Sequence, residues 1–183
     1  MRVEASPPTT ARRRRSPGLW CHEPATHGGA ARVGGGAVRA EPVRTEDNRA
    51  YTEGSYGYLG RTGTVTTRQP IAGTDDRALY SSAAKGAYEY RFDGLPDGTY
   101  QVELGFAELS NTQPGKRVFD VLAEGVQELP DVDIALEAGG TYRALARTFT
   151  VHVVDGQLNL RFASPSDQPL VNSIRVTHRP DLG

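Results

Sequence analysis

Short runs in which apolar and polar residues alternate dominate the chain from about residue 46 onward. Tyr88, Tyr90 and Phe92 alternate with charged neighbours, and the same period recurs at residues 100–106, 149–153 and 158–162. A period of two places apolar side chains on one face of a strand. Asp-Gly pairs at 93–94, 97–98 and 155–156 separate the runs and are typical of tight turns. The pattern predicts an all-β fold, an antiparallel sandwich or jelly roll, in which residues 130–140 form a loop.

The first 45 residues differ in composition from the rest of the chain. They carry eight Arg and three Glu, a balance of +5, whereas residues 46–183 carry 13 basic and 19 acidic residues, a balance of −6. The N-terminal stretch is rich in Pro, Gly and Arg and has few branched apolar side chains, so it cannot offset its ordering entropy. We predict a disordered N-terminal tail over residues 1–45 and one domain over residues 46–179. An acidic domain argues against nucleic acid as its partner.

Several other classes of protein are excluded by what the sequence lacks. No run of eighteen apolar residues is present, so we expect no membrane insertion. The single cysteine, Cys21, excludes an internal disulfide and a zinc site built from cysteines. Nucleophile-elbow, zinc-protease and phosphate-loop motifs are also absent. We therefore predict no catalytic residues, no metal site and no cofactor.

Ordered blocks of sequence carry a more specific signal. GTDD at residues 73–76 is followed by Leu79 and Tyr80, and the turn at 94–98 leads to FAE at 106–108. GKRVFDV at 115–121, DGQLNL at 155–160 and a closing strand at 171–176 come next. In this order, over residues 50–177, the blocks resemble those of bacterial malectin-like domains. Residues 31–40 are similar to a degenerate form of the family's opening strand.

The resemblance implies a jelly-roll β-sandwich that binds glucose-type oligosaccharides or polysaccharides and is not an enzyme. Related domains occur in exported bacterial proteins, beside glycoside hydrolases or peptidases, and in receptor ectodomains of plants. It therefore also implies an extracellular or cell-surface accessory module, next to a fused or neighbouring hydrolase or peptidase domain. No signal peptide is visible in the chain, because no apolar stretch follows the arginine run at residues 12–15.

The family's sugar-binding positions can be matched to this sequence one by one. A loop tyrosine of the family matches Tyr56 or Tyr58, which are framed by glycines in a segment predicted to be an exposed loop. Replacing both tyrosines by alanine is expected to abolish sugar binding and to leave the melting temperature nearly unchanged. The family's aspartate in the last loop matches Asp167.

Three further positions match the family without its aromatic residues. Lys85 stands where the family has a second tyrosine, and Ser110 and Asn111 stand where it has two adjacent aromatic residues. Because aromatic faces pack on the C–H groups of sugars, these replacements predict an altered sugar preference. The alternative is a structural or protein-interaction β-sandwich that has lost sugar binding.

Acidic residues outside these positions have two possible roles. If the domain were a glycoside hydrolase, Glu108 and Asp120 would be its candidate catalytic pair. Hydrogen bonds to neighbouring loops are the simpler role for these two carboxylates. Asp131, Asp133 and Glu137 have the oxygen ligands that calcium prefers, although the resemblance requires no calcium ion there.

Overall fold

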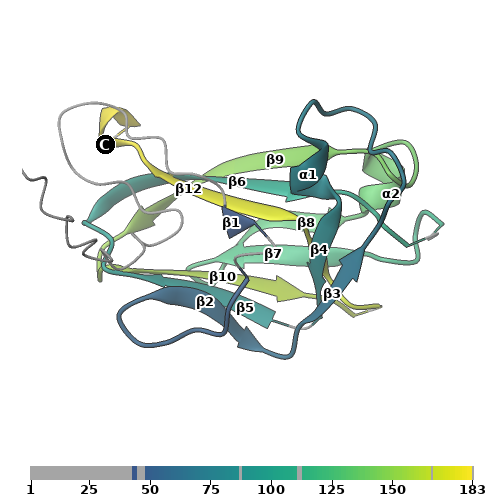
Figure 1. The fold of residues 1–183 in the computed structure, drawn as a ribbon. Coiled ribbons are helices and arrows are strands. Elements are labelled where there is room, and N and C mark those ends of the chain that lie inside the picture. The colour runs from purple at the N-terminus through teal and green to yellow at the C-terminus, as the bar shows by residue number, and fades with distance from the viewer. Residues whose placement is uncertain (1–42, 45–47, 87, 111–112, 166, 183) are drawn as a thin grey trace, which may run out of the picture.

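Two antiparallel β-sheets form the two main layers of the computed structural model, which describes residues 43–44, 48–86, 88–110, 113–165 and 167–182 (Figure 1). The four-stranded sheet has the order β1 (Val43–Arg44), β12 (Ser173–His178), β6 (Gly98–Phe106) and β9 (Leu145–Val153). The five-stranded sheet has the order β2 (Tyr56–Gly60), β5 (Tyr88–Asp93), β10 (Gln157–Ala163), β7 (Phe119–Ala123) and β8 (Val126–Val132). The all-β, antiparallel fold is thereby confirmed, and the jelly-roll connectivity stays a prediction.

Alternation along the strands produces the core between these layers. Tyr88, Tyr90 and Phe92 are buried, and the charged residues between them are half-buried. The rings of Phe106 in β6 and Phe119 in β7 lie 5.8 Å apart at an angle of 62°, so aromatic side chains join the two sheets. Each large apolar side chain buried in this way contributes about 1.5–3 kcal/mol relative to exposure. The core thus fixes the strands whose ends carry the candidate site.

A third, smaller sheet lies at one end of the two layers (Figure 1). Its strand order is β11 (Leu170–Val171), β4 (Ser82–Lys85) and β3 (Gly63–Thr66). A one-turn helix, α1 (Arg77–Tyr80), immediately precedes β4. The side chain of Asp76 caps this helix by accepting a hydrogen bond from Leu79 N at 3.1 Å, as short polar residues commonly do.

The prediction that residues 130–140 form a loop is wrong for residues 130–137 and is confirmed for residues 138–140, which form a turn. Strand β8 extends to Val132, and residues Ile134–Glu137 form a second one-turn helix, α2. Asp133 begins the helix because its side chain accepts a hydrogen bond from Leu136 N, while Glu137 accepts one from Asp133 N. These reciprocal bonds resemble a capping box. A 3₁₀ turn, η2 (Pro180–Leu182), follows β12.

The predicted N-terminal tail lies largely outside the described residues. Strand β1 is nevertheless described at Val43–Arg44, just ahead of the predicted domain start at residue 46, and Val43 pairs with Ile174 of β12. Within the part of the chain that the structure describes, no helix combines the length and the apolar character needed to cross a membrane.

Candidate functional site

Lys85 and Asp167 meet at the end of the sandwich where the third sheet lies. Lys85 is the last residue of β4 and pairs with Leu170 of β11, so the loop before β11 runs beside it. In that loop Asp167 has a φ of +50°, and its Oδ1 atom lies 3.8 Å from Lys85 Nζ. The two side chains are 27% and 38% exposed. Two of the predicted site residues are therefore adjacent and accessible to solvent.

Arg117 contacts this pair and is not among the predicted site residues. Its side chain is 2% exposed, and its Nε donates a hydrogen bond to Glu108 Oε2 at 2.7 Å. Its Nη2 lies 3.3 Å from Asp167 Oδ2, and its Nη1 donates to the carbonyl oxygen of Gln168. A planar guanidinium can satisfy several acceptors at once. One buried side chain thus connects the segment after β6 to the loop that carries Asp167.

Ser110 joins the same group through Glu108. Its backbone N–H donates to Glu108 Oε1 at 2.9 Å, so both oxygens of this fully buried carboxylate have partners. A buried carboxylate without a partner would cost several kcal/mol, which the pairing offsets. Asn111 lies outside the described residues. The name Lys85 cluster is used below for five residues: Lys85, Glu108, Ser110, Arg117 and Asp167.

A polar pocket of about 480 Å³ opens at this end of the five-stranded sheet. It is formed where β2 and β10 end and β5 begins, by Leu59, Gly60, Tyr88, Glu89, Arg161, Phe162, Ala163 and Ser164. The hydroxyl of Tyr88 donates to the carbonyl oxygen of Ala84, next to Lys85, at 3.4 Å. Ser164 precedes Asp167 by three residues. Two of the residues that line the pocket are therefore close in sequence to members of the Lys85 cluster.

Tyr56 and Tyr58 lie in strand β2, so the prediction that they form an exposed loop is wrong. The reason is that β2 pairs with β5 along its whole length. A Cβ atom at Gly57 would lie 2.6 Å from the carbonyl oxygen of Arg49, so this glycine permits close backbone approach. Gly57, between the two tyrosines, thus reflects strand packing.

The two tyrosines differ in their distance from the pocket. Tyr56 is 8% exposed, and its ring stacks on Phe92 at 6.1 Å between centroids. Tyr56 pairs with Phe92, which lies four residues along β5 from Tyr88 of the pocket. At about 3.4 Å per residue, Tyr56 is therefore about 14 Å from the pocket. Tyr58 is half-buried and lies two residues before Gly60 of the pocket. The structure therefore brings Tyr58 nearer to the Lys85 cluster than Tyr56.

The acidic residues considered for other roles have hydrogen-bond partners in the fold. Besides the bonds of Glu108, Asp120 Oδ1 accepts from Asp131 N at 2.9 Å, which confirms the predicted hydrogen-bonding role of both carboxylates. Asp133 accepts from Gly115 N, and Glu137 pairs with Arg147. Across the described ranges, no group of three or more His, Cys, Asp or Glu side chains is arranged to hold a metal ion.

A separate polar network lies at the opposite end of β5. Asp93 accepts hydrogen bonds from the hydroxyl of Tyr51 at 2.6 Å, from Gly54 N at 2.8 Å and from Gln157 Nε2 at 2.7 Å. Burial raises the pKa of the Asp93 carboxyl, but the hydrogen bonds, led by that of Tyr51, outweigh it and hold the pKa below its ordinary value. This network fixes the segment before β2 to the sheet.

An antiparallel β-sandwich with a polar pocket and ion-paired loops at one end has the architecture of a ligand-binding module. A comparison of the sequence with known protein families identifies the family. Residues 31–179 match the family described as Malectin domain, and the chain belongs to that family.

Individual relatives share parts of this chain. It is 42% identical over 102 residues to receptor-like protein 4 of Arabidopsis thaliana, covering 54% of this chain and 16% of the relative. It is 32% identical over 123 residues to kinesin-like protein KIN-14E of Oryza sativa subsp. japonica, covering 62% of this chain and 11% of the relative. The crystal structure of a β-glucuronidase from Bacteroides uniformis shares 26% identity and a TM-score of 0.67, covering 72% and 15% of the two chains. The chain thus spans a small part of each of these proteins.

Proposed function

We propose that the chain is a non-catalytic carbohydrate-binding module that takes a glucose-type oligosaccharide or polysaccharide. One observation carries this proposal: the lining of a solvent-accessible polar pocket of about 480 Å³ includes Ser164, three residues before Asp167, and Tyr88, three residues after Lys85. Pockets of this size accommodate small ligands, and a few well-placed polar groups orient them. Membership of the malectin family supports the same class of ligand.

The members of the Lys85 cluster have distinct roles in this proposal. Lys85 donates hydrogen bonds to sugar hydroxyls, and Asp167 accepts them. Arg117 is a positioning residue, because its buried guanidinium holds Asp167 and the carbonyl oxygen of Gln168. Ser110 and Asn111 add polar contacts, and Tyr58 is the tyrosine whose place in β2 best fits a contact with the sugar. The site would therefore bind mainly through polar contacts.

The setting of the module is also part of the proposal. Receptor-like protein 4 and the β-glucuronidase each contain much more chain than this one. We propose that the module works outside the cell, as an accessory domain of a larger protein. A fused or neighbouring hydrolase or peptidase would then act on the polysaccharide that the module binds.

Calorimetric and chemical-shift titrations with maltose, nigerose and cello-oligosaccharides test the proposal. Asp167→Asn and Lys85→Ala are each expected to weaken binding about tenfold, because a hydrogen bond to a charged group contributes about 1.5 kcal/mol or more. Glu103→Gln is the matched control, since it removes an exposed partner of Arg175 on the other sheet. Absence of a response to every saccharide at millimolar concentration would refute the proposal.

A protein-interaction role is the second candidate, and one observation favours it. Lys85, at a position where the family has a stacking tyrosine, is paired with Asp167 at 3.8 Å. An exposed ion pair of this kind suits a charged protein surface. If the saccharides give no response, Asp167→Asn should instead weaken binding to a neighbouring domain of the full-length protein.

A further inference from the structure

A second pocket lies on the other side of β4, between the segment after β3 and helix α1. Its volume is about 420 Å³, and it is lined by Thr67, Arg68, Gln69, Pro70, Ile71, Arg77, Ala78 and Ser81. Ser82, which follows Ser81, pairs with Thr66, whereas Lys85 pairs with Gly63. The second pocket and Lys85 therefore lie at opposite ends of the paired strands β3 and β4. We name this second pocket the arginine pocket.

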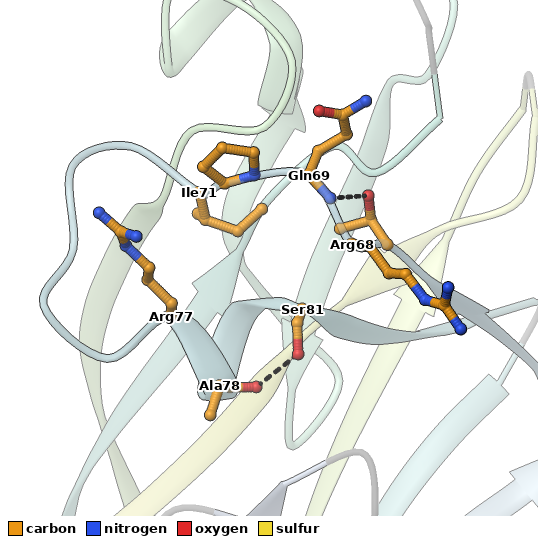
Figure 2. A pocket seen from close by; sticks show the side chains of 8 residues that line it. Arg68, Gln69, Ile71, Arg77, Ala78 and Ser81 are labelled. Carbon is orange, nitrogen blue, oxygen red and sulfur yellow. Dashed lines mark hydrogen bonds between the residues drawn. The ribbon is translucent and has the colours of Figure 1, made fainter.

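The charge of the arginine pocket comes from Arg68 and Arg77. Its lining residues include these two arginines and no Asp or Glu. Among the described residues, Arg91, Arg117 and Arg175 pair with carboxylates, whereas neither Arg68 nor Arg77 has such a partner. Figure 2 shows these two side chains on opposite sides of the pocket, with Ile71 and Ser81 between them. Their guanidinium groups point away from each other (Figure 2), so an anionic group at either side of the pocket can pair with one of them.

The walls of the arginine pocket are held in place by hydrogen bonds. Thr67 N donates to the carbonyl oxygen of Ser81 at 2.9 Å and connects the two sides. Gln69 N donates to Thr67 Oγ1 at 3.0 Å, and Ser81 Oγ donates to the carbonyl oxygen of Ala78 at 3.0 Å (Figure 2). Ile71, 2% exposed, is anchored in the core. The site is therefore largely formed before any ligand arrives, which lowers the cost of binding.

The polar groups of the lining suit a ligand that also carries hydroxyls. The Thr67 hydroxyl accepts from Gln69 N and keeps its own hydrogen to donate, whereas the Ser81 hydroxyl donates to Ala78 and keeps lone pairs to accept. The side-chain amide of Gln69 adds both a donor and an acceptor. Pro70 supplies an apolar ring beside these groups. This mixture fits the alternating hydroxyl and C–H surface of a sugar.

We infer that the arginine pocket binds a small, hydroxyl-rich molecule with an anionic oxygen group, either a carboxylate or a phosphate ester. Guanidinium groups bind both anions with planar, directional hydrogen bonds. Each contact at an exposed site strengthens binding by a factor of about two to five. The inference does not depend on the proposed function, because none of the Lys85 cluster lines this pocket.

Chemical-shift titrations with glucuronate, glucose 6-phosphate and glucose test the inference. At least one of the two anions is expected to bind about two to five times more tightly than glucose, from one contact of that strength. Glucuronate binding alone identifies a carboxylate ligand, and glucose 6-phosphate binding alone identifies a phosphate ester. Raising the salt concentration should weaken either complex, because exposed charges are screened.

Variants show whether any binding belongs to this pocket. The double variant Arg68→Ala with Arg77→Ala should lose the preference for the anion over glucose. Arg61→Ala is the matched control, since it removes an exposed arginine that does not line the pocket, and it should bind like the original protein. Anions that bind no better than glucose, or binding that the double variant retains, would overturn the inference. Loss of maltose binding in Asp167→Asn leaves this result unaffected, so the two sites can be judged separately.

Discussion

The buried Arg117–Glu108 pair allows a quantitative test of how the loops of the Lys85 cluster are held. Arg117→Met keeps most of the side-chain volume but leaves Glu108, which is fully buried, without its cation. Removing one partner of a buried pair costs about 3–5 kcal/mol, because the remaining charge is uncompensated. For a domain of this size, 1 kcal/mol corresponds to about 3–4 °C in melting temperature. Arg117→Met should therefore lower the melting temperature by about 9–20 °C.

Urea unfolding and thermal melts followed by circular dichroism measure this loss. Glu108→Leu added to Arg117→Met should recover most of the stability, because replacing both ions by apolar groups is often neutral or stabilising. Arg175→Met is the control, since its partner Glu103 is 40% exposed and such exposed pairs contribute about 1 kcal/mol or less. If Arg117→Met is no less stable than Arg175→Met, or if Glu108→Leu worsens it, the account of this pair is refuted.

Two further predictions concern the opposite end of β5. Tyr56→Ala should lower the free energy of unfolding by about 3 kcal/mol, because the ring is 8% exposed and stacks on Phe92. This prediction replaces the expectation of an unchanged melting temperature. An unchanged midpoint of urea unfolding would contradict it. Asp93→Asn should flatten the loss of stability in acid. Burial raises the pKa of Asp93, but the hydrogen bonds of Tyr51, Gln157 and Gly54 outweigh it and lower that pKa. The stabilisation is therefore present above the unfolded-state pKa of about 4 and is lost as the pH falls through the native value. Parallel melting-temperature curves for variant and original protein between about pH 5 and pH 2 would contradict this assignment.

The long strands were predictable from sequence because their side chains alternate. Strands β5, β6, β9 and β10 coincide with the runs around Tyr88, Tyr100, Phe149 and Leu158. The third sheet was not predictable in the same way, because β4 has the sequence SAAK and contains no large apolar residue. Its two alanines are buried by the packing of the surrounding elements. Local alternation cannot reveal strands whose burial depends on distant segments.

Some residues of the candidate site were predictable from the sequence, and others were not. Family position alone predicted Lys85 and Asp167, which the structure places 3.8 Å apart. Arg117 could not be found in that way, since an arginine beside glycine and lysine in the sequence ordinarily lies on a solvent-exposed turn. Its burial follows from Glu108, which the chain places in the interior two residues after the end of β6. Only the tertiary fold brings these opposite charges together.

The buried residues that hold the loops of the candidate site differ from the residues that face solvent there. Arg117 and Glu108 are 2% and 0% exposed, whereas Lys85 and Asp167 are 27% and 38% exposed. The contacts of Arg117 with Glu108 and with the carbonyl oxygen of Gln168 involve none of the side chains at positions 85, 110 and 111. The loops can therefore keep their positions when aromatic residues at those three positions are replaced. On the proposed function, we therefore expect loss of the family's aromatic residues to change which ligand the site selects and to leave its supporting framework in place.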